Sequence, residues 1–377
     1  MTKLPLITRR ILDRVCCETS GILLTLLDQL VNGNPIRISS TARDTAKQRK
    51  ALNSQMGRQY AEAIRNFHRD HDILTAGPKE LLQFAADMFN RFGPAGKNPD
   101  IETINEGQIK PLFNYTNYRN GKVLSLAKGK KRLFSWKQAT ERSVIDVLLQ
   151  HYHKTVRFCP YCNAAPIYYH DNANGPQKRK PPCDHFFPQS VFPFLALSLY
   201  NLIPACDRCN RIKLDQFSLK KPIAYPHLDD LHQLVAFRPS ITSISDLYGN
   251  DEEKDSFSIA IVPTNNDRAT GRGRQLVEEL EMESFYRANF RTEAKDVMIK
   301  TAQFTRAYQE YIQRTCSLKD IFDAQRLLFG TPLRPESIHN HFLAKMILDI
   351  QQFCESNRII PLRIHSSKNT IPEIPNA

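Results

Sequence analysis

The chain has 377 residues, of which 41% are hydrophobic and 24% are charged, so it is long enough for about two or three domains with buried cores. It contains no run of eighteen apolar residues, which excludes a membrane-spanning helix, and its first residues lack the apolar stretch of a secretory signal. Lysine and arginine outnumber aspartate and glutamate by 52 to 39, and this net charge of +13 favours a polyanionic partner, although solubility or attraction to a membrane surface would also explain it.

Residues 1–117 predict a helical N-terminal region. Apolar residues recur at helical spacing over residues 5–31, which indicates an amphipathic helix. A second helix is predicted over residues 40–68 and a third over residues 79–92, each with capping residues at its start or a Gly-Pro stop at its end. Residues 95–112 show no such pattern, and we interpret them as an irregular connector.

Residues 118–225 begin with a strongly basic segment. Between residues 119 and 180 there are thirteen lysines and arginines against three acids, a net charge of +10. Four of these cations are clustered just before two aromatic residues: Lys128, Lys130, Lys131 and Arg132. A solvated charged face would also produce this pattern. Because a cluster of metal-ligand residues follows directly, we interpret the four cations as a surface that binds nucleic-acid phosphates.

Residues 226–377 predict a mostly helical C-terminal region. Helical periodicity returns over residues 270–355, with a capping signal at Pro335-Glu336-Ser337. Alternating apolar residues over 256–262 predict one strand.

Four of the nine cysteines form two Cys-x-x-Cys pairs, Cys159 with Cys162 and Cys206 with Cys209. This spacing lets one tight turn present two sulfurs, and two such pairs supply the four thiolates of a tetrahedral Zn²⁺ site. The 43 residues between the pairs exceed the usual gap of about 15–20 residues, so a folded segment should lie between them. A redox pair would occur once, near a βαβ pattern, and the sequence shows neither feature. The pairs therefore predict a structural zinc site.

Other cysteines and histidines are weaker candidates for metal ligands. The five remaining cysteines show no ligand spacing and are interpreted as buried, unreactive thiols: Cys16, Cys17, Cys183, Cys316 and Cys354. Three histidines near the first cysteine pair could replace a thiolate, although four cysteines already suffice: His151, His153 and His170.

A further set of polar residues lies between and after the cysteine pairs, in the order Asp184-His185-x-x-Pro188, Asn201-Leu202 and Asn210-x-x-Lys213. Together with the cysteine pairs, this string resembles the HNH endonucleases, and the resemblance covers the 55 residues from Cys159 to Lys213. It implies a central ββα-metal core with a structural four-cysteine zinc site. Together with the mostly helical N- and C-terminal regions that the periodicity predicts on either side of this core, we expect an α+β fold.

The resemblance also implies a role for each residue of the string. His185 would be the general base, Asn201 would hold the loop that orients His185, and Lys213 would contact a phosphate of the nucleic acid. Asp184 and Asn210 would bind the catalytic cation, and Asn210 stands where many relatives have histidine.

The chemistry of these side chains agrees with those roles. Carboxylate and amide oxygens suit Mg²⁺ or Mn²⁺, and an imidazole with an ordinary pKa of about 6.5 accepts a proton near neutral pH. Successive residues of a strand point to opposite sides, so Asp184 and His185 should lie at a strand end or in a loop if both face one phosphate.

These expectations together predict a metal-dependent HNH endonuclease that hydrolyses DNA in the cytoplasm. Two alternatives stay open: a non-catalytic zinc-containing nucleic-acid-binding protein, and an RNA-cleaving nuclease with the same site. The layout of a nuclease core between helical extensions resembles effectors of prokaryotic anti-phage defence, some of which work beside an ATPase. Besides DNA, a partner ATPase or another defence subunit is therefore an expected partner, although a restriction or mobile-element nuclease fits nearly as well.

Overall fold

The computed structural model describes most of the chain, namely residues 4, 9–36, 45–94, 97–116, 123–125, 132–135, 144–169, 180–243, 245–248, 256–331 and 334–357. The described residues form two compact units. The first unit consists of three segments: Met1–Val235, Pro263–Met282 and Pro335–Leu343. The second unit consists of Ala236–Val262, Glu283–Arg334 and Ala344–Ala377. The predicted N-terminal helices and the predicted core therefore belong to one unit.

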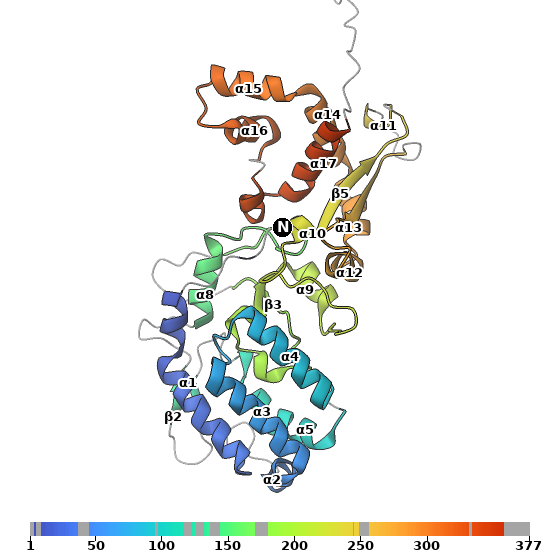
Figure 1. Ribbon diagram of the computed structural model, residues 1–377. Helices are drawn as coiled ribbons and strands as arrows, with labels where there is room; N and C mark the ends of the chain where they lie inside the picture. The colour runs from blue at the N-terminus through green and yellow to red at the C-terminus, as the bar shows by residue number, and fades with distance from the viewer. Residues whose placement is uncertain are drawn as a thin grey trace, which may run out of the picture. The chain divides into compact units, whose positions relative to one another are not determined.

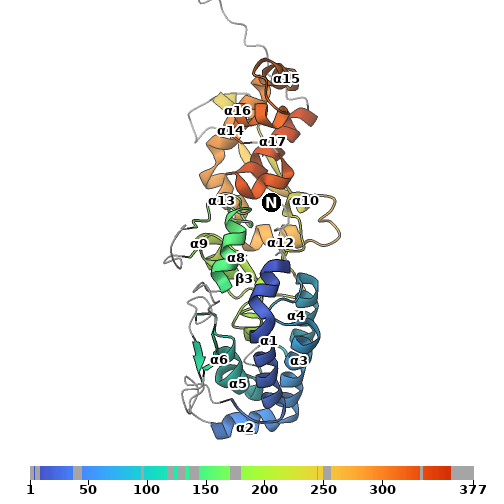
Figure 2. The ribbon, with the colours of Figure 1, turned by 90° about the vertical axis from the view of Figure 1, so that its left-hand side faces the viewer.

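The first unit begins with four long helices: α1 (Arg9–Val31), α2 (Thr45–Asn53), α3 (Gln55–His71) and α4 (Pro78–Phe92). Helix α3 packs against both α1 and α4 and lies between them in Figure 1, and Figure 2 shows α1 in front from the side. The buried side chains of α3 and α4 recur every three or four residues, as in amphipathic helices that pack on a common core. The predicted first and third helices are thus confirmed within the described residues.

The predicted second helix is divided into α2 and α3. Ser54 is the N-cap of α3, and its hydroxyl accepts a hydrogen bond from the backbone N–H of Gly57 at 3.0 Å. The chain turns so sharply here that a Cβ atom at Gly57 would collide with the carbonyl oxygen of Ala51. Periodicity did not reveal this break, because both helices are amphipathic.

The predicted irregular connector over residues 95–112 is wrong. This segment contains α5 (Pro99–Ile104), a π-helical turn (Asn105–Ile109) and α6 (Lys110–Leu112). Asn98 caps α5, because its side-chain oxygen accepts hydrogen bonds from the N–H groups of the second and third helical residues. Pro99 occupies the first helical position, where proline is favoured. The segment is helical because its apolar residues pack against α2 and α3.

Short strands and helices follow in the first unit. They are β1 (Val123–Ser125), β2 (Arg132–Ser135), α8 (Val144–His153), β3 (Cys183–His185), two 3-10 turns (Pro193–Leu195 and Leu199–Asn201), β4 (Leu202–Pro204) and α9 (Asp207–Lys213). Later segments add α10 (Leu231–Leu234), α12 (Arg272–Glu279) and a 3-10 helix (Pro335–Asn340). Strand β1 pairs antiparallel with β2, and β3 pairs antiparallel with β4. The chain is therefore α+β, with mostly helical terminal regions, as predicted.

The second unit combines one small sheet with helices. Strand β5 (Val235–Ser240) is hydrogen-bonded to β6 (Ser258–Pro263), and the helices are α11 (Ser245–Tyr248), α13 (Met282–Asn289), α14 (Arg291–Gln303), α15 (Arg306–Thr315), α16 (Ile321–Phe329) and α17 (Ala344–Ser356). The sequence predicted β6 and the helices from α13 onward. It missed the short helix α11 and strand β5, whose proline and charged residue interrupt the apolar alternation. Helix α14 packs against α17.

No helix among the described residues is both long and apolar enough to cross a membrane. The prediction of buried cysteines holds for Cys183 and Cys354, whereas Cys316 is exposed. Cys316 directly follows the last residue of α15, where no other element covers its side chain.

Candidate metal centre and polar site

Four buried cysteines come together although 43 residues separate the two pairs. The Sγ atoms of Cys159, Cys162, Cys206 and Cys209 all lie within 4.8 Å of one another. Such a group can hold a metal ion such as zinc, because four sulfurs at this spacing surround a tetrahedral centre. No histidine among the described residues takes part in this group, which we call the four-cysteine cluster.

The pKa values of two of the four thiols are shifted in opposite directions. Burial, followed by the neighbouring thiols, raises the pKa of Cys159 well above its usual range. Hydrogen bonds from the neighbouring thiols instead lower the pKa of Cys206. Zinc binds cysteine as the thiolate, so a bound cation would favour loss of the thiol protons.

A tight turn presents the first cysteine pair. The N–H of Asn163 donates to the carbonyl of Cys159 at 2.7 Å, and Asn163 has a left-handed backbone with φ 54°. Asparagine tolerates this conformation better than most residues. Its buried side chain donates to the carbonyl of Ile338 at 2.8 Å, which attaches the turn to a later segment of the same unit.

The second cysteine pair starts a helix that follows directly on a two-stranded sheet. In the register of this sheet, Asp184 of β3 lies opposite Ile203 of β4. Cys206 is the N-cap of α9, and its sulfur accepts a hydrogen bond from the N–H of Cys209 at 3.4 Å. The order is therefore strand, strand and helix, with the four-cysteine cluster at the junction of β4 and α9. We call β3, β4 and α9 the strand–strand–helix unit.

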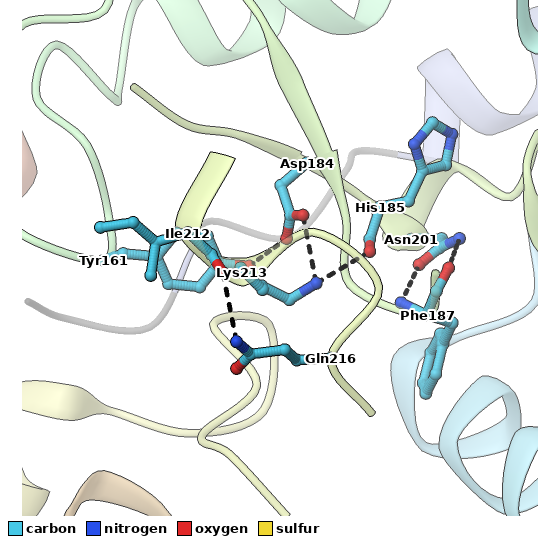
Figure 3. A network of polar contacts seen from close by, with 8 residues as sticks. All are labelled: Tyr161, Asp184, His185, Phe187, Asn201, Ile212, Lys213 and Gln216. Atoms are coloured by element: carbon cyan, nitrogen blue, oxygen red, sulfur yellow. Dashed lines mark hydrogen bonds and ion pairs between the residues drawn. The ribbon is translucent and has the colours of Figure 1, made fainter. Parts of the chain in front are cut away.

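Asp184 is the centre of a buried polar network. Its carboxylate accepts a hydrogen bond at Oδ2 from the Tyr161 hydroxyl, at 2.6 Å, and forms an ion pair at Oδ1 with the Lys213 ammonium, at 3.1 Å (Figure 3). Asp184 is 2% exposed and Lys213 is fully buried. Burial, and then the Asp184 charge, raise the pKa of Tyr161 well above its usual range, so the phenol keeps its proton and acts as the donor.

The Lys213 ammonium contacts groups of the protein itself. We expected its ammonium to contact a nucleic-acid phosphate, but it donates instead to Asp184 and, at 3.0 Å, to the carbonyl of His185. The ammonium also lies 5.6 Å from the ring centroid of Phe186. Lys213 is the last residue of α9, and its whole side chain is buried. In this structure Lys213 is a counter-ion for Asp184.

His185 points away from the Asp184 carboxylate (Figure 3). His185 is the last residue of β3, as the argument from a strand end required, yet the pleat still directs the two side chains to opposite sides. The expectation that both groups face one phosphate is therefore not met in this conformation.

The imidazole of His185 has a defined tautomer. Its Nε2 lies 3.1 Å from the carbonyl oxygen of Ala196, and a carbonyl only accepts, so Nε2 carries the proton. The lone pair is then on Nδ1. The ring of Tyr115 lies 4.5 Å away in an edge-to-face arrangement. Burial lowers the pKa of His185 from its ordinary 6.5 to about 4, so the ring is neutral at pH 7.

Asn201 holds the loop that follows β3. Its side chain is fully buried, accepts a hydrogen bond from the N–H of Phe187 at 2.7 Å, and donates to the carbonyl of Leu195 at 2.9 Å. Because Leu195 precedes Ala196, Asn201 fixes the segment that carries the partner of His185 Nε2. These are the contacts of a residue that positions a loop.

The structure gives less information on the remaining predicted site residues. Asn210 is half-buried on α9, three residues before Lys213. Lys128, Lys130 and Lys131 lie outside the described residues, and of Arg132 only the backbone, in β2, is described.

Sequence reasoning missed two groups in this region. The first is the Tyr161 hydroxyl, and the second is the carbonyl of Ala196. Tyr161 could have been suspected from its place between two ligand cysteines, whereas no sequence signal marks a backbone carbonyl.

Comparisons with known proteins give no relative. The chain matches no protein-family model, no curated protein and no solved structure.

Proposed function

We propose that this chain is a metal-dependent HNH endonuclease that hydrolyses phosphodiester bonds of DNA. The observation that carries the proposal is the strand–strand–helix unit built on the four-cysteine cluster. This unit carries four residues of the HNH string, Asp184, His185, Asn210 and Lys213, and the 3-10 turn directly before β4 carries the fifth, Asn201, so all five follow in the order that the family shows.

His185 is the proposed general base. The bond from Nε2 to the Ala196 carbonyl leaves the lone pair on Nδ1, and the lowered pKa keeps the imidazole unprotonated at neutral pH. Such a nitrogen accepts a proton from an attacking water, a contribution of about 10²–10⁴-fold in rate. Asn201 supports this role by holding the loop that carries Ala196.

Asp184 and Asn210 are the proposed ligands of a catalytic Mg²⁺ or Mn²⁺. The donor types fit, because a carboxylate and an amide oxygen are hard ligands and a carboxylate offers more lone pairs than its two present bonds use. The Lys213 ammonium at Oδ1 and a metal cation bound to the same carboxylate would repel each other. Lys213 must therefore move away from Asp184 when the metal ion binds. A bound cation would neutralise charge on the phosphoryl oxygens.

The four-cysteine cluster is the proposed structural Zn²⁺ site. Its four ligands are all cysteines and all buried, which is typical of closed structural sites and leaves no open position for a substrate.

The proposed partners and location follow from charge and cysteine chemistry. The cations from Lys128 to Arg132 would bind DNA phosphates. A partner ATPase and a role in anti-phage defence stay proposals that depend on the layout of the chain alone. Reduced cysteine pairs that bind zinc are consistent with a cytoplasmic location.

A specific observation favours one alternative, a non-catalytic zinc-containing nucleic-acid-binding protein. Asp184 is buried and already neutralised by Lys213, which is the state expected of a carboxylate that stabilises the fold. The same site acting on RNA is a further variant, since the chemistry of phosphodiester hydrolysis does not depend on the sugar.

The test is a cleavage assay with purified protein on plasmid DNA and on RNA, with and without Mg²⁺. We expect Mg²⁺-dependent cleavage that His185→Ala lowers by about 10²–10⁴-fold. His71→Ala, which removes an exposed imidazole from α3, is the matched control and should cleave like the wild type. Absence of cleavage by the wild type on both substrates, with zinc bound and DNA binding intact, would favour the non-catalytic alternative.

A further inference from the structure

The Tyr161 hydroxyl connects the four-cysteine cluster to the Asp184 carboxylate. Tyr161 lies between Cys159 and Cys162, so the loop that presents two sulfurs also fixes its backbone. Its side chain is fully buried and reaches Asp184 Oδ2 with a hydrogen bond of 2.6 Å (Figure 3). A bound metal would hold both flanking cysteines and thereby the ring between them.

We propose that Tyr161 is a positioning residue through which the four-cysteine cluster sets the place and orientation of the Asp184 carboxylate. The cluster then controls the affinity of the polar site for a divalent cation, in addition to stabilising the fold. This inference rests on the proposed nuclease function, because it assigns Asp184 to cation binding.

The physical reason is that a carboxylate binds a cation well only when its orientation is fixed in advance. Asp184 is at present held at both oxygens, by Tyr161 at Oδ2 and by Lys213 at Oδ1. If Lys213 moves away when a cation binds, the hydrogen bond from Tyr161 still holds the Asp184 carboxylate. Loss of a hydrogen-bonding partner behind a metal ligand typically costs about 10–100-fold in metal affinity or activity.

The experiment compares Tyr161→Phe with Tyr60→Phe in the zinc-loaded full chain. Tyr60 is the matched control, because it is also buried in the first unit and donates one hydrogen bond, at 2.7 Å to Asn105. Mn²⁺ binding is measured by calorimetry, with Asp184→Asn as the reference for a lost site. Zinc content, urea unfolding and Mg²⁺-dependent cleavage are measured on the same samples.

We expect Tyr161→Phe to keep its zinc, to lose a similar amount of stability as Tyr60→Phe, and to bind Mn²⁺ about 10–100-fold more weakly than the control. Equal Mn²⁺ affinity of the two variants, in a protein that cleaves DNA, would overturn the inference and leave the nuclease proposal intact. If the wild type neither cleaves nucleic acid nor binds Mn²⁺ more tightly than Asp184→Asn, both the nuclease proposal and the inference fail.

Discussion

The buried ion pair between Lys213 and Asp184 offers a direct test of the described network. Lys213→Met keeps most of the length and volume of the side chain but removes its charge. The variant leaves the Asp184 carboxylate buried without its counter-ion and the carbonyl of His185 without one of its donors. Removal of one partner from a buried ion pair costs about 3–5 kcal/mol, because the remaining charge is uncompensated.

The size of the effect follows from burial. The Lys213 side chain is fully buried and that of Asp184 is 3% exposed, so water cannot replace the lost ammonium without opening the unit. At about 2–4 °C per kcal/mol for a unit of this general size, Lys213→Met should lower the melting temperature by about 6–20 °C. Lys221→Met, which changes an exposed lysine of the same unit, should change stability by no more than about 0.5 kcal/mol.

A double-mutant cycle separates charge from packing. The neutral variant Asp184→Asn, combined with Lys213→Met, removes both charges at once, so the double variant should be more stable than Lys213→Met alone. Urea unfolding monitored by circular dichroism gives the four free energies. Strict additivity, or a Lys213→Met variant as stable as the wild type, would refute the ion pair as a determinant of stability.

Two further predictions concern the metal centre and His185. Cys159→Ser should release zinc and unfold the strand–strand–helix unit, because structural zinc contributes folding energy directly; elemental analysis should find about one zinc per wild-type chain and none in the variant. A folded, metal-free wild type would contradict the site. The pKa of His185 is lowered to about 4 in the folded chain, so the unfolded chain binds more protons between pH 4 and 6.5. The neutral His185 imidazole contributes up to about 3 kcal/mol to the free energy of unfolding. This contribution is complete above pH 6.5 and is lost as the pH falls towards 4. His185→Gln should therefore reduce the difference in unfolding free energy between about pH 7.5 and pH 4.5. An unchanged difference would argue against the neutral, half-buried imidazole.

Several features of this protein could be read from the sequence alone. The spacing of the cysteine pairs predicted a four-ligand centre, and the structure brings the four sulfurs together. Local periodicity predicted α1, α4 and β6. In α4 and β6 the buried residues recur on one face, which is the pattern that periodicity detects. Sequence patterns of this kind suffice where a residue's neighbours along the chain decide its conformation.

Other features depended on contacts between distant segments. The helices over residues 99–112 form because their apolar residues meet α2 and α3, and the break at Ser54 follows from the close approach of Gly57 to Ala51. Neither contact leaves a periodic signal.

The chemistry of the polar site was decided by tertiary structure as well. Sequence order placed Asp184, His185 and Lys213 in one string, but it could not tell where their side chains point. The strand pleat separates the carboxylate from the imidazole, and the buried ammonium of Lys213 forms an ion pair with Asp184. Burial also lowers the pKa of His185 well below the value expected for an isolated imidazole. The sequence by itself determined which groups are present and in which order; the three-dimensional packing decided which of them meet, because burial and charge compensation depend on neighbours far apart in the chain.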